Sequence, residues 1–320
     1  MASPEQPRSA SEPPLAVMLM GPTCSGKTDL AVELAQRFPL EIISVDSAMV
    51  YRGMDIGTAK PDAATLVRAP HRLIDICDPA ETYSAARFRR DALREMQAIQ
   101  AAGRIPLLVG GTGLYFRALE RGLAELPPGD PVVRARLNRE AQELGWPALH
   151  QRLSAIDPEA GARIHPNDSQ RLQRALEVFE LSGISLSEWL ARKTELPLPY
   201  RVIKMVLAPR HREALYVRAA ERFQRMLSRG LVDEARCLFQ RPELMPDRPA
   251  VRMVGYHEVW LFLDGRIDYA EMVRLAVLNT RRLAKRQLTW FRAEGHARWF
   301  DADHPDVLGH VVEYLRAAGC

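Results

Sequence analysis

The sequence has few of the features that would assign it to a secreted, metal-binding or membrane class. Its 320 residues include four widely spaced cysteines without a C-x-x-C pair, so neither a disulfide framework nor a zinc site is expected. No apolar run approaches the length of a membrane span, which predicts no membrane partner. Residues 1–14 are polar and rich in Pro and Ser, and we expect a disordered tail instead of a signal peptide. Together these features predict a cytoplasmic protein with reduced thiols.

Lysine is also scarce. Only Lys27, Lys60, Lys193, Lys204 and Lys285 occur among 44 basic residues, which leaves 39 arginines. A formal net charge of +4 does not by itself require a nucleic-acid partner, but arginine suits phosphate and nucleobase contacts better than lysine does. A hydrophobic content of 47% is ordinary for a globular protein, so the chain can form one large domain or two moderate ones.

A phosphate-binding loop is the most specific motif. Residues 21–28 match G-x-x-x-x-G-K-[ST], between a strand-length apolar run at 15–20 and a helical pattern at 29–38. Successive N–H groups of such a loop converge at a helix N-terminus and favour anions, Lys27 adds positive charge, and the Thr28 hydroxyl can hold Mg²⁺. We expect a phosphate or diphosphate to bind, although the motif does not say whether it is hydrolysed, transferred or released. The loop consists of Gly21, Pro22, Thr23, Cys24, Ser25, Gly26, Lys27 and Thr28.

Further ligand contacts are expected at neighbouring strand ends. A buried strand at 41–45 ends at Asp46, and ligands of open α/β sheets lie outside such carboxyl ends. By position alone Asp46 is either a turn-capping residue or a catalytic base. A second Gly-rich strand end, at 110–113, also predicts close approach of a ligand. The loop at 51–61, which contains two glycines and a proline, is expected to line the same crevice.

The order of the remaining patterns indicates the domain organisation. We expect a short strand at 73–76, a helix at 85–102 and a strand at 105–109. After a Pro-rich linker from residue 126, only helical patterns follow, at 131–144, 146–156 and 168–181, before a strand at 202–207 and helices from 211 onward. The predicted fold is α/β, a P-loop NTPase-like parallel sheet flanked by helices at 15–125 and 200–320, with an α-helical insertion at 126–199.

Four basic clusters are interleaved with aromatic residues. A charged run on a helix is usually a solvated face, but four clusters with interleaved Tyr and Trp indicate a polyanion that also offers bases for stacking. The clusters are 170–174; Arg218, Arg222 and Arg225; 252–257; and 280–287 followed by Trp290 and Arg292.

These motifs together resemble those of the tRNA dimethylallyltransferases, also called tRNA isopentenyltransferases. The resemblance covers nearly the whole chain except the tail, and the loop ending in Gly57-Thr58-Ala59-Lys60-Pro61 is its most specific part. It implies transfer of a dimethylallyl group from dimethylallyl diphosphate to N6 of the adenosine 3′-adjacent to the anticodon (position 37), in tRNAs that read codons beginning with U. It also implies a monomeric, Mg²⁺-dependent enzyme whose insertion embraces the tRNA anticodon arm. The matching segments are 21–28, 44–48, 51–61, 70–75, 109–112, 165–168, 170–172, 254–256 and 283–287.

The resemblance also implies roles for individual residues. Asp46 would accept the proton of the attacking amine. Lys27, Thr28 with Mg²⁺, Arg222 and the loop amides would stabilise the departing diphosphate. The target adenine would leave its stack to reach the pocket. The implied tRNA contacts are Asp46, Ser47, Ala48, Met49, Thr112, Arg134, Gln170, Arg171, Leu172, Gln173, Arg174, Arg252, Met253, Val254, Gly255, Tyr256, His257, Thr280, Arg281, Arg282, Leu283, Ala284, Lys285, Arg286 and Gln287.

Three other functions fit parts of the pattern. In a P-loop small-molecule kinase, Asp46 would deprotonate an attacking hydroxyl group, but such a kinase has no evident need for the helical insertion. A free adenine-nucleotide prenyltransferase would not need the basic inserted helix. A non-catalytic RNA-binding module would leave the phosphate loop and Asp46 unexplained.

Overall fold

The computed structural model describes residues 13–124, 126–192, 197–245 and 248–320, and it divides into two compact units. Unit 1 comprises Met1–Glu120 and Leu198–Cys320, and unit 2 comprises Arg121–Pro197. The predicted insertion at 126–199 has nearly the same bounds as unit 2. The tail predicted at 1–14 lies outside the described residues up to residue 12, and so do residue 125 and residues 193–196 near the predicted domain boundaries.

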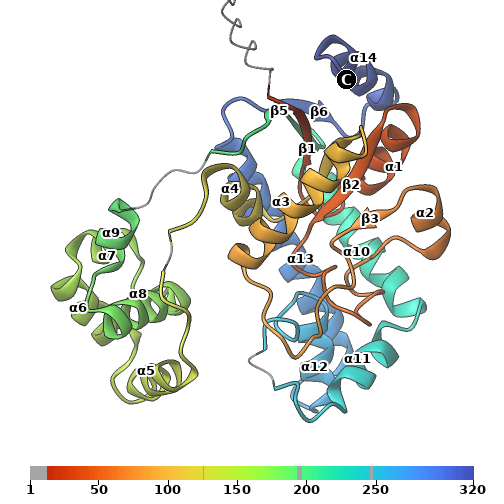
Figure 1. Cartoon of the computed structure of the whole chain (residues 1–320). Coiled ribbons are helices and arrows are strands. Elements are labelled where there is room, and N and C mark those ends of the chain that lie inside the picture. The colour runs from red at the N-terminus through yellow and green to blue at the C-terminus, as the bar shows by residue number, and fades with distance from the viewer. Residues whose placement is uncertain (1–12, 125, 193–196, 246–247) are drawn as a thin grey trace, which may run out of the picture. The chain divides into compact units, whose positions relative to one another are not determined.

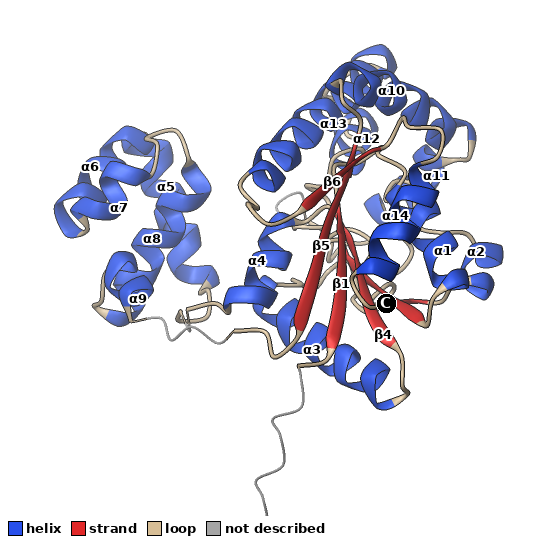
Figure 2. Ribbon diagram, turned by 90° about the horizontal axis from the view of Figure 1, so that it is seen from above, coloured by secondary structure: helices blue, strands red, loops and turns tan. Residues whose placement is uncertain are grey.

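Within the described residues, a parallel sheet of six strands forms the centre of unit 1 (Figure 2). The strand order is β3-β2-β4-β1-β5-β6, and every neighbouring pair is parallel. The central strands are apolar and buried, as expected where helices cover both faces of a parallel sheet. The strands are β1 (Leu15–Met20), β2 (Leu40–Val45), β3 (His71–Arg72), β4 (Ile105–Gly110), β5 (Arg201–Ala208) and β6 (Arg298–Asp301).

Alternate residues of β1, β2, β4 and β5 enter two hydrophobic cores, one on each face of the sheet. From β1, Met18 and Met20 join one core, whereas Val17 and Leu19 join the other. This alternation follows from the two-residue period of a strand. Helices α3 (Ala85–Ala101), α4 (Gly113–Arg121), α10 (Arg212–Ser228) and α13 (Tyr269–Arg292) contribute to the first core, and α1 (Lys27–Arg37) and α14 (Val307–Ala317) to the second. Helices α11 (Leu231–Phe239) and α12 (Tyr256–Leu263) also contribute to the first core, and the remaining helix described in unit 1 is α2 (Ala63–Arg68).

Unit 2 is helical, with its own core (Figure 1). Its helices begin at residues that cap them: the Asp130 carboxylate accepts hydrogen bonds from the N–H groups of Val132 and Val133, and Asp168 accepts one from Arg171. Leu137, Leu149 and Leu172 are fully or almost fully buried in its core. The helices are α5 (Pro131–Leu144), α6 (Trp146–Ile156), α7 (Pro158–Arg163), α8 (Ser169–Ser182) and α9 (Leu186–Ala191). The α/β fold with a helical insertion is therefore confirmed.

Two predicted elements are wrong. The strand expected at 73–76 is replaced by β3, because Leu73 and Asp75 have φ angles of 62° and 55°, which turn the chain out of the sheet. The all-helical interpretation after residue 211 misses β6, a strand of four residues at the edge of the sheet. Only Phe300 of that strand is buried, which is too little apolar periodicity to predict a strand. No helix in the described ranges is long and apolar enough to span a membrane.

Candidate active site

The phosphate loop connects β1 to α1. Gly21 allows the chain to pass close to β5, because a Cβ atom there would lie 2.3 Å from the carbonyl oxygen of Leu207. Gly26 has a φ angle of 81° and directly precedes Lys27, the first residue of α1. Within the described residues, the N–H groups of residues 24–28 find no hydrogen-bond acceptor. Five backbone donors at a helix N-terminus are therefore open to an anion.

Lys27 is poised to gain a counter-anion. Its Nζ donates to the carbonyl oxygen of Pro22 at 2.6 Å and lies 3.4 Å from Ser25 Oγ. The pKa of Lys27 is lowered to about 8, mainly by desolvation; the nearby Asp46 opposes this shift and Arg222 adds to it. An anion bound beside this ammonium group would stabilise its charged form and raise the pKa.

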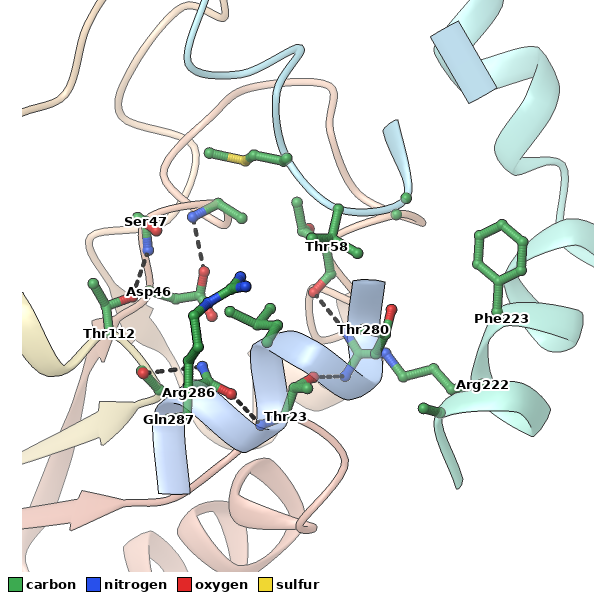
Figure 3. A pocket seen from close by; sticks show the side chains of 18 of the residues that line it. Thr23, Asp46, Ser47, Thr58, Thr112, Arg222, Phe223, Thr280, Arg286 and Gln287 are labelled. Atoms are coloured by element: carbon green, nitrogen blue, oxygen red, sulfur yellow. Dashed lines mark hydrogen bonds between the residues drawn. The ribbon is translucent and has the colours of Figure 1, made fainter. Parts of the chain in front are cut away.

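Arg222 reaches the loop from α10. Its Nη1 donates to Thr23 Oγ1 at 3.3 Å, and its Nη2 donates to the carbonyl oxygen of Thr58 at 3.2 Å (Figure 3). Phe223, the next residue, is buried and lines the same cavity. The guanidinium group is thus fixed between the phosphate loop and the loop at 51–61. The other two arginines of this predicted cluster do not join it, since Arg218 pairs with Asp303 and Arg225 is exposed.

Asp46 is both a turn-capping residue and a pocket residue. One carboxylate oxygen accepts hydrogen bonds from the N–H groups of Ala48, at 2.8 Å, and Met49, at 3.4 Å. Its other oxygen has no hydrogen-bond partner among the residues that the structure describes. Beside it, Thr112 Oγ1 accepts a hydrogen bond from the N–H group of Ser47 at 3.2 Å (Figure 3). The two interpretations left open by the sequence are compatible, because one oxygen orients the side chain and the other remains available.

Asp46, Thr112, Arg222 and, from the phosphate loop, Thr23 line one cavity of about 440 Å³ within unit 1. Its polar side includes Thr23, Asp46 and Arg222. Its apolar side comes from α10, α13 and the segment before α12. Met253, Val254 and Leu283 were predicted as tRNA contacts, but Ala219 and Met226 were missed because they have the spacing of ordinary core positions. The apolar side consists of Ala219, Phe223, Met226, Met253, Val254, Leu283 and Trp290.

Gln287 joins α13 to the phosphate loop. Its Oε1 accepts a hydrogen bond from the N–H group of Thr23 at 2.8 Å, and its Nε2 donates to the carbonyl oxygen of Gly111 at 2.9 Å. Each end of this amide makes one hydrogen bond within the protein, so Gln287 links α13 to the phosphate loop. Gln287 also lines the cavity, and its tRNA contact stays a prediction. The hydrogen bond to Oε1 occupies the Thr23 amide, which was predicted to face the diphosphate.

The other predicted tRNA contacts of unit 1 fall into three groups. Arg252, Met253, Val254, Gly255, Thr280, Leu283 and Arg286 line the cavity, together with Ser47, Ala48 and Thr112. Arg282 and Lys285 are exposed elsewhere on α13, Arg281 lies over the Tyr216 ring, and Met49 and His257 are partly buried. Tyr256 and Ala284 are 3% and 1% exposed. Because their side chains are enclosed by the protein, the predicted RNA contact through Tyr256 and Ala284 is corrected to a packing role.

The predicted contacts of unit 2 centre on a buried carboxylate that the sequence analysis missed. Glu177, with no exposed surface, accepts hydrogen bonds from Arg134, Arg174 and the N–H group of Asp130. Burial raises the pKa of Glu177, but these hydrogen bonds outweigh it and hold the pKa below its ordinary value. A single acidic residue within the apolar run 175–179 was the signal that could have identified it.

The rest of the predicted segment on α8 has mixed surroundings. Leu172 is fully buried in the core of unit 2, which corrects its predicted contact to a packing role. Arg171 is exposed and pairs with Asp168 at 3.4 Å, and Gln173 donates to Asn138 at 2.7 Å. Gln170 is also exposed. The exposed face of this segment therefore consists of Gln170, Arg171 and the outer part of Gln173.

Comparisons with known proteins agree on one family. The family model described as IPP transferase matches residues 49–294, and the isopentenyl transferase model matches residues 15–75. A solved tRNA isopentenylpyrophosphate transferase from Bacillus halodurans is 39% identical, with a TM-score of 0.70, over 95% of this chain and 96% of that one. A tRNA delta(2)-isopentenylpyrophosphate transferase from Staphylococcus epidermidis is 31% identical, with a TM-score of 0.68, over 96% and 100%. A eukaryotic dimethylallyltransferase acting on tRNA is 25% identical, with a TM-score of 0.74, over 90% and 74%.

Proposed function

The chain belongs to the IPP transferase family and prenylates tRNA; from this premise we propose that its donor is dimethylallyl diphosphate. We further propose that the acceptor is N6 of the adenosine at position 37, 3′-adjacent to the anticodon, in tRNAs that read codons beginning with U. Family membership disfavours the kinase and the free-nucleotide prenyltransferase. A monomeric state and a cytoplasmic location remain predictions.

The two-sided cavity supports this donor. Dimethylallyl diphosphate has a strongly anionic head and a short branched hydrocarbon tail. Thr23 and Arg222 line the cavity, and the free amides of residues 24–28 with Lys27 follow Thr23 in the same loop. Together they offer donors and positive charge to the head. The apolar wall that includes Phe223, Met226 and Leu283 offers a dry surface to the tail.

The proposed reaction exchanges one bond at the allylic carbon for another. Its bond to the diphosphate oxygen breaks while the adenine N6 forms a new bond, and the diphosphate leaves with the electron pair. The amides, Lys27 and Arg222 stabilise the negative charge that develops on the leaving group. The amine is a weak nucleophile, because its lone pair is delocalised into the ring, and the free oxygen of Asp46 takes its proton as attack proceeds.

We propose Thr28 as the protein ligand of a Mg²⁺ ion. Its hydroxyl group follows Lys27 at the start of α1, and it makes no hydrogen bond within the described part of the chain. The described residues contain no group of three His, Cys, Asp or Glu side chains that could hold a metal. This fits Mg²⁺, which usually keeps several waters and binds through one or two protein oxygens plus substrate phosphates. When bound, the ion would neutralise charge on the diphosphate.

We propose that exposed basic residues hold the anticodon arm. In unit 1 these are Arg282, Lys285 and Arg286 on α13, and in unit 2 Arg171 on α8. Phosphate contacts of this kind supply affinity that depends on salt, whereas the residues that line the cavity would surround the flipped adenine. Arg134 and Arg174 would contribute through the guanidinium edges that Glu177 leaves exposed.

One observation carries the proposal: Asp46, Arg222 and Thr23 of the phosphate loop line one cavity that also has an apolar wall. The direct test is incubation of the protein with labelled dimethylallyl diphosphate, Mg²⁺ and bulk tRNA, followed by nucleoside mass analysis. We expect released diphosphate and a prenylated adenosine. ADP release with a phosphorylated small molecule, or prenylation of free adenine nucleotides in preference to tRNA, would contradict the proposal.

A further inference from the structure

A carboxylate on α11 holds a loop next to the cavity. Glu234 accepts hydrogen bonds from the N–H groups of three successive residues: Asp55 at 2.9 Å, Ile56 at 2.9 Å and Gly57 at 3.2 Å. The Tyr256 hydroxyl group donates a fourth hydrogen bond to the same carboxylate. Successive backbone N–H groups form an anion-binding concavity, and here the anion is a side chain of the protein itself.

The loop fits tightly against the residues that hold it. A Cβ atom on Gly57 would lie 2.5 Å from the Tyr256 ring and 2.9 Å from Leu231, so only glycine permits this approach. The Tyr256 hydroxyl group also accepts a hydrogen bond from the N–H group of Gly57 at 3.2 Å. Burial, followed by the neighbouring Glu234, raises the pKa of Tyr256, so the phenol stays protonated and continues to donate. Glu234 and Tyr256 thus fix the position of residues 55–57.

The next residue connects this loop to the site. The Thr58 carbonyl oxygen accepts the hydrogen bond from Arg222 Nη2, and the other arm of Arg222 reaches Thr23 in the phosphate loop. The Thr58 side chain is buried, and its hydroxyl group donates to the carbonyl oxygen of Met54 at 2.6 Å. Gly57 and Thr58 line the cavity, whereas Glu234 does not. A displacement of residues 55–57 would therefore move the acceptor that orients Arg222.

We infer that Glu234 is a positioning residue for the proposed transfer. Glu234 accepts hydrogen bonds from the N–H groups of residues 55–57 and thereby fixes the position of the Thr58 carbonyl oxygen. Through this oxygen it fixes the orientation of Arg222 toward the donor's diphosphate. This inference rests on the proposed function for its ligand. Glu234 would thus affect diphosphate binding without contacting the diphosphate.

A second anchor keeps the loop folded when Glu234 is changed. Lys60, almost fully buried, donates to the carbonyl oxygen of Tyr51 at 2.6 Å, to Asp55 Oδ1 at 2.6 Å and to Asp75 Oδ1. These bonds hold the two ends of the segment 51–60 independently of α11. We therefore expect Glu234 variants to fold and to lose the orientation of Arg222 specifically.

The test is a double-mutant cycle between Glu234→Ala and Arg222→Ala. Binding of inorganic pyrophosphate is measured by calorimetry, and kcat and KM for dimethylallyl diphosphate are measured with saturating tRNA. We expect Glu234→Ala to weaken pyrophosphate binding and to lower kcat/KM about tenfold, a coupling typical of residues in one hydrogen-bond network. In the Arg222→Ala background the same change should cost less than about twofold, because its intermediary is gone.

Asp233→Ala is the matched control. Asp233 precedes Glu234 on α11, but it is exposed and pairs with Arg236 on the same helix. We expect it to leave pyrophosphate binding unchanged. An equal loss in Asp233→Ala, or effects of Glu234→Ala that are the same with and without Arg222, would overturn the inference.

Two further variants keep the test decisive if Glu234→Ala does not fold. Glu234→Gln retains one carbonyl acceptor but turns an NH₂ group toward backbone N–H donors, and Tyr256→Phe removes only a hydroxyl group. Both should lower pyrophosphate affinity in the wild-type background and not in the Arg222→Ala background, and failure of both to do so would overturn the inference. Because pyrophosphate binding needs no prenyl transfer, a protein that showed the coupling but did not prenylate tRNA would contradict the proposed function alone.

Discussion

Two loops in unit 1 present successive backbone N–H groups, and they differ in what faces them. At residues 24–28 the described structure provides no acceptor, and Lys27 and Arg222 add positive charge. At residues 55–57 the chain provides its own anion, Glu234. The same backbone geometry therefore serves binding in the first loop and scaffolding in the second. What decides the outcome is whether a carboxylate from elsewhere in the chain occupies the concavity.

The largest effect is expected from substitution of Asp46, the proposed general base. Asp46→Ala should lower turnover by about 10²–10⁴-fold, the usual contribution of a general base, and leave tRNA binding nearly intact. Single-turnover rates and tRNA binding by filter retention check the two parts. Asp46→Asn is the matched variant, since it preserves the turn-capping acceptor and removes the basic oxygen; near-wild-type rates in either variant would exclude Asp46 as the base.

We call the loop at residues 24–28 open, because no side chain in the described part of the protein accepts its N–H groups, and the loop at residues 55–57 closed, because Glu234 does. A carboxylate introduced beside the open loop should make it resemble the closed loop. Ser25 is buried, with its hydroxyl group 3.4 Å from Lys27 Nζ. In Ser25→Asp the new carboxylate should pair with Lys27 and compete with the diphosphate, which weakens pyrophosphate binding about 10- to 100-fold, the range of a charged hydrogen bond. Ser25→Asn has the same size without the charge. Equal pyrophosphate affinities of the Asp and Asn variants would contradict the proposal that an internal carboxylate distinguishes the two loops.

The pH dependence of donor binding tests whether Lys27 lacks an anionic partner until the diphosphate binds. The pKa of Lys27 is lowered to about 8 in the free protein, mainly by desolvation, and a bound diphosphate favours the charged form. Affinity should therefore be constant below pH 8 and fall toward tenfold per pH unit above it, as binding comes to require proton uptake. Calorimetry with pyrophosphate from pH 7 to 9.5 measures this bend. Lys27→Arg should remove the bend, because its guanidinium group stays charged; a flat wild-type profile would contradict the account.

The smallest effects are expected from substitutions on the exposed face of α13, which belongs to neither loop. Replacing Lys285 or Arg282 by Ala should weaken tRNA binding a few-fold and reduce the slope of log affinity against log salt by about one for each phosphate that is no longer neutralised. Binding of pyrophosphate should stay unchanged, which separates RNA affinity from donor affinity. A wild-type tRNA affinity that does not vary with salt would exclude this face as an RNA surface.

The open loop could be predicted from the sequence, and the closed one could not. A phosphate loop is local in sequence: residues 21–28, the preceding strand and the following helix define it together. Asp46 was found because it follows a strong strand pattern. Glu234, by contrast, lies 177 to 179 residues from the amides that it binds, and Gln287 lies 264 residues from Thr23. No local pattern encodes such contacts.

The mistaken elements have the same origin. Leu73 and Asp75 leave the strand conformation where Lys60 and the carbonyl oxygen of Met49 bind Asp75, which is a tertiary influence on a locally strand-like run. The strand β6 exists because the edge of β5 is available to a short segment with one buried aromatic residue. The buried Tyr256 and Ala284, in turn, were placed on an RNA surface because a basic cluster in sequence does not show which of its residues face inward.

A structure of the protein with tRNA and an unreactive thiodiphosphate analogue of dimethylallyl diphosphate tests the central claim most directly. We predict that the diphosphate group occupies the amides of residues 24–28, within hydrogen-bond distance of Lys27 and Arg222, and that the adenine amine lies against the free oxygen of Asp46. Glu234 should remain on the amides of residues 55–57. A diphosphate outside the phosphate loop, or an Asp46 carboxylate beyond reach of the amine nitrogen, would contradict the account.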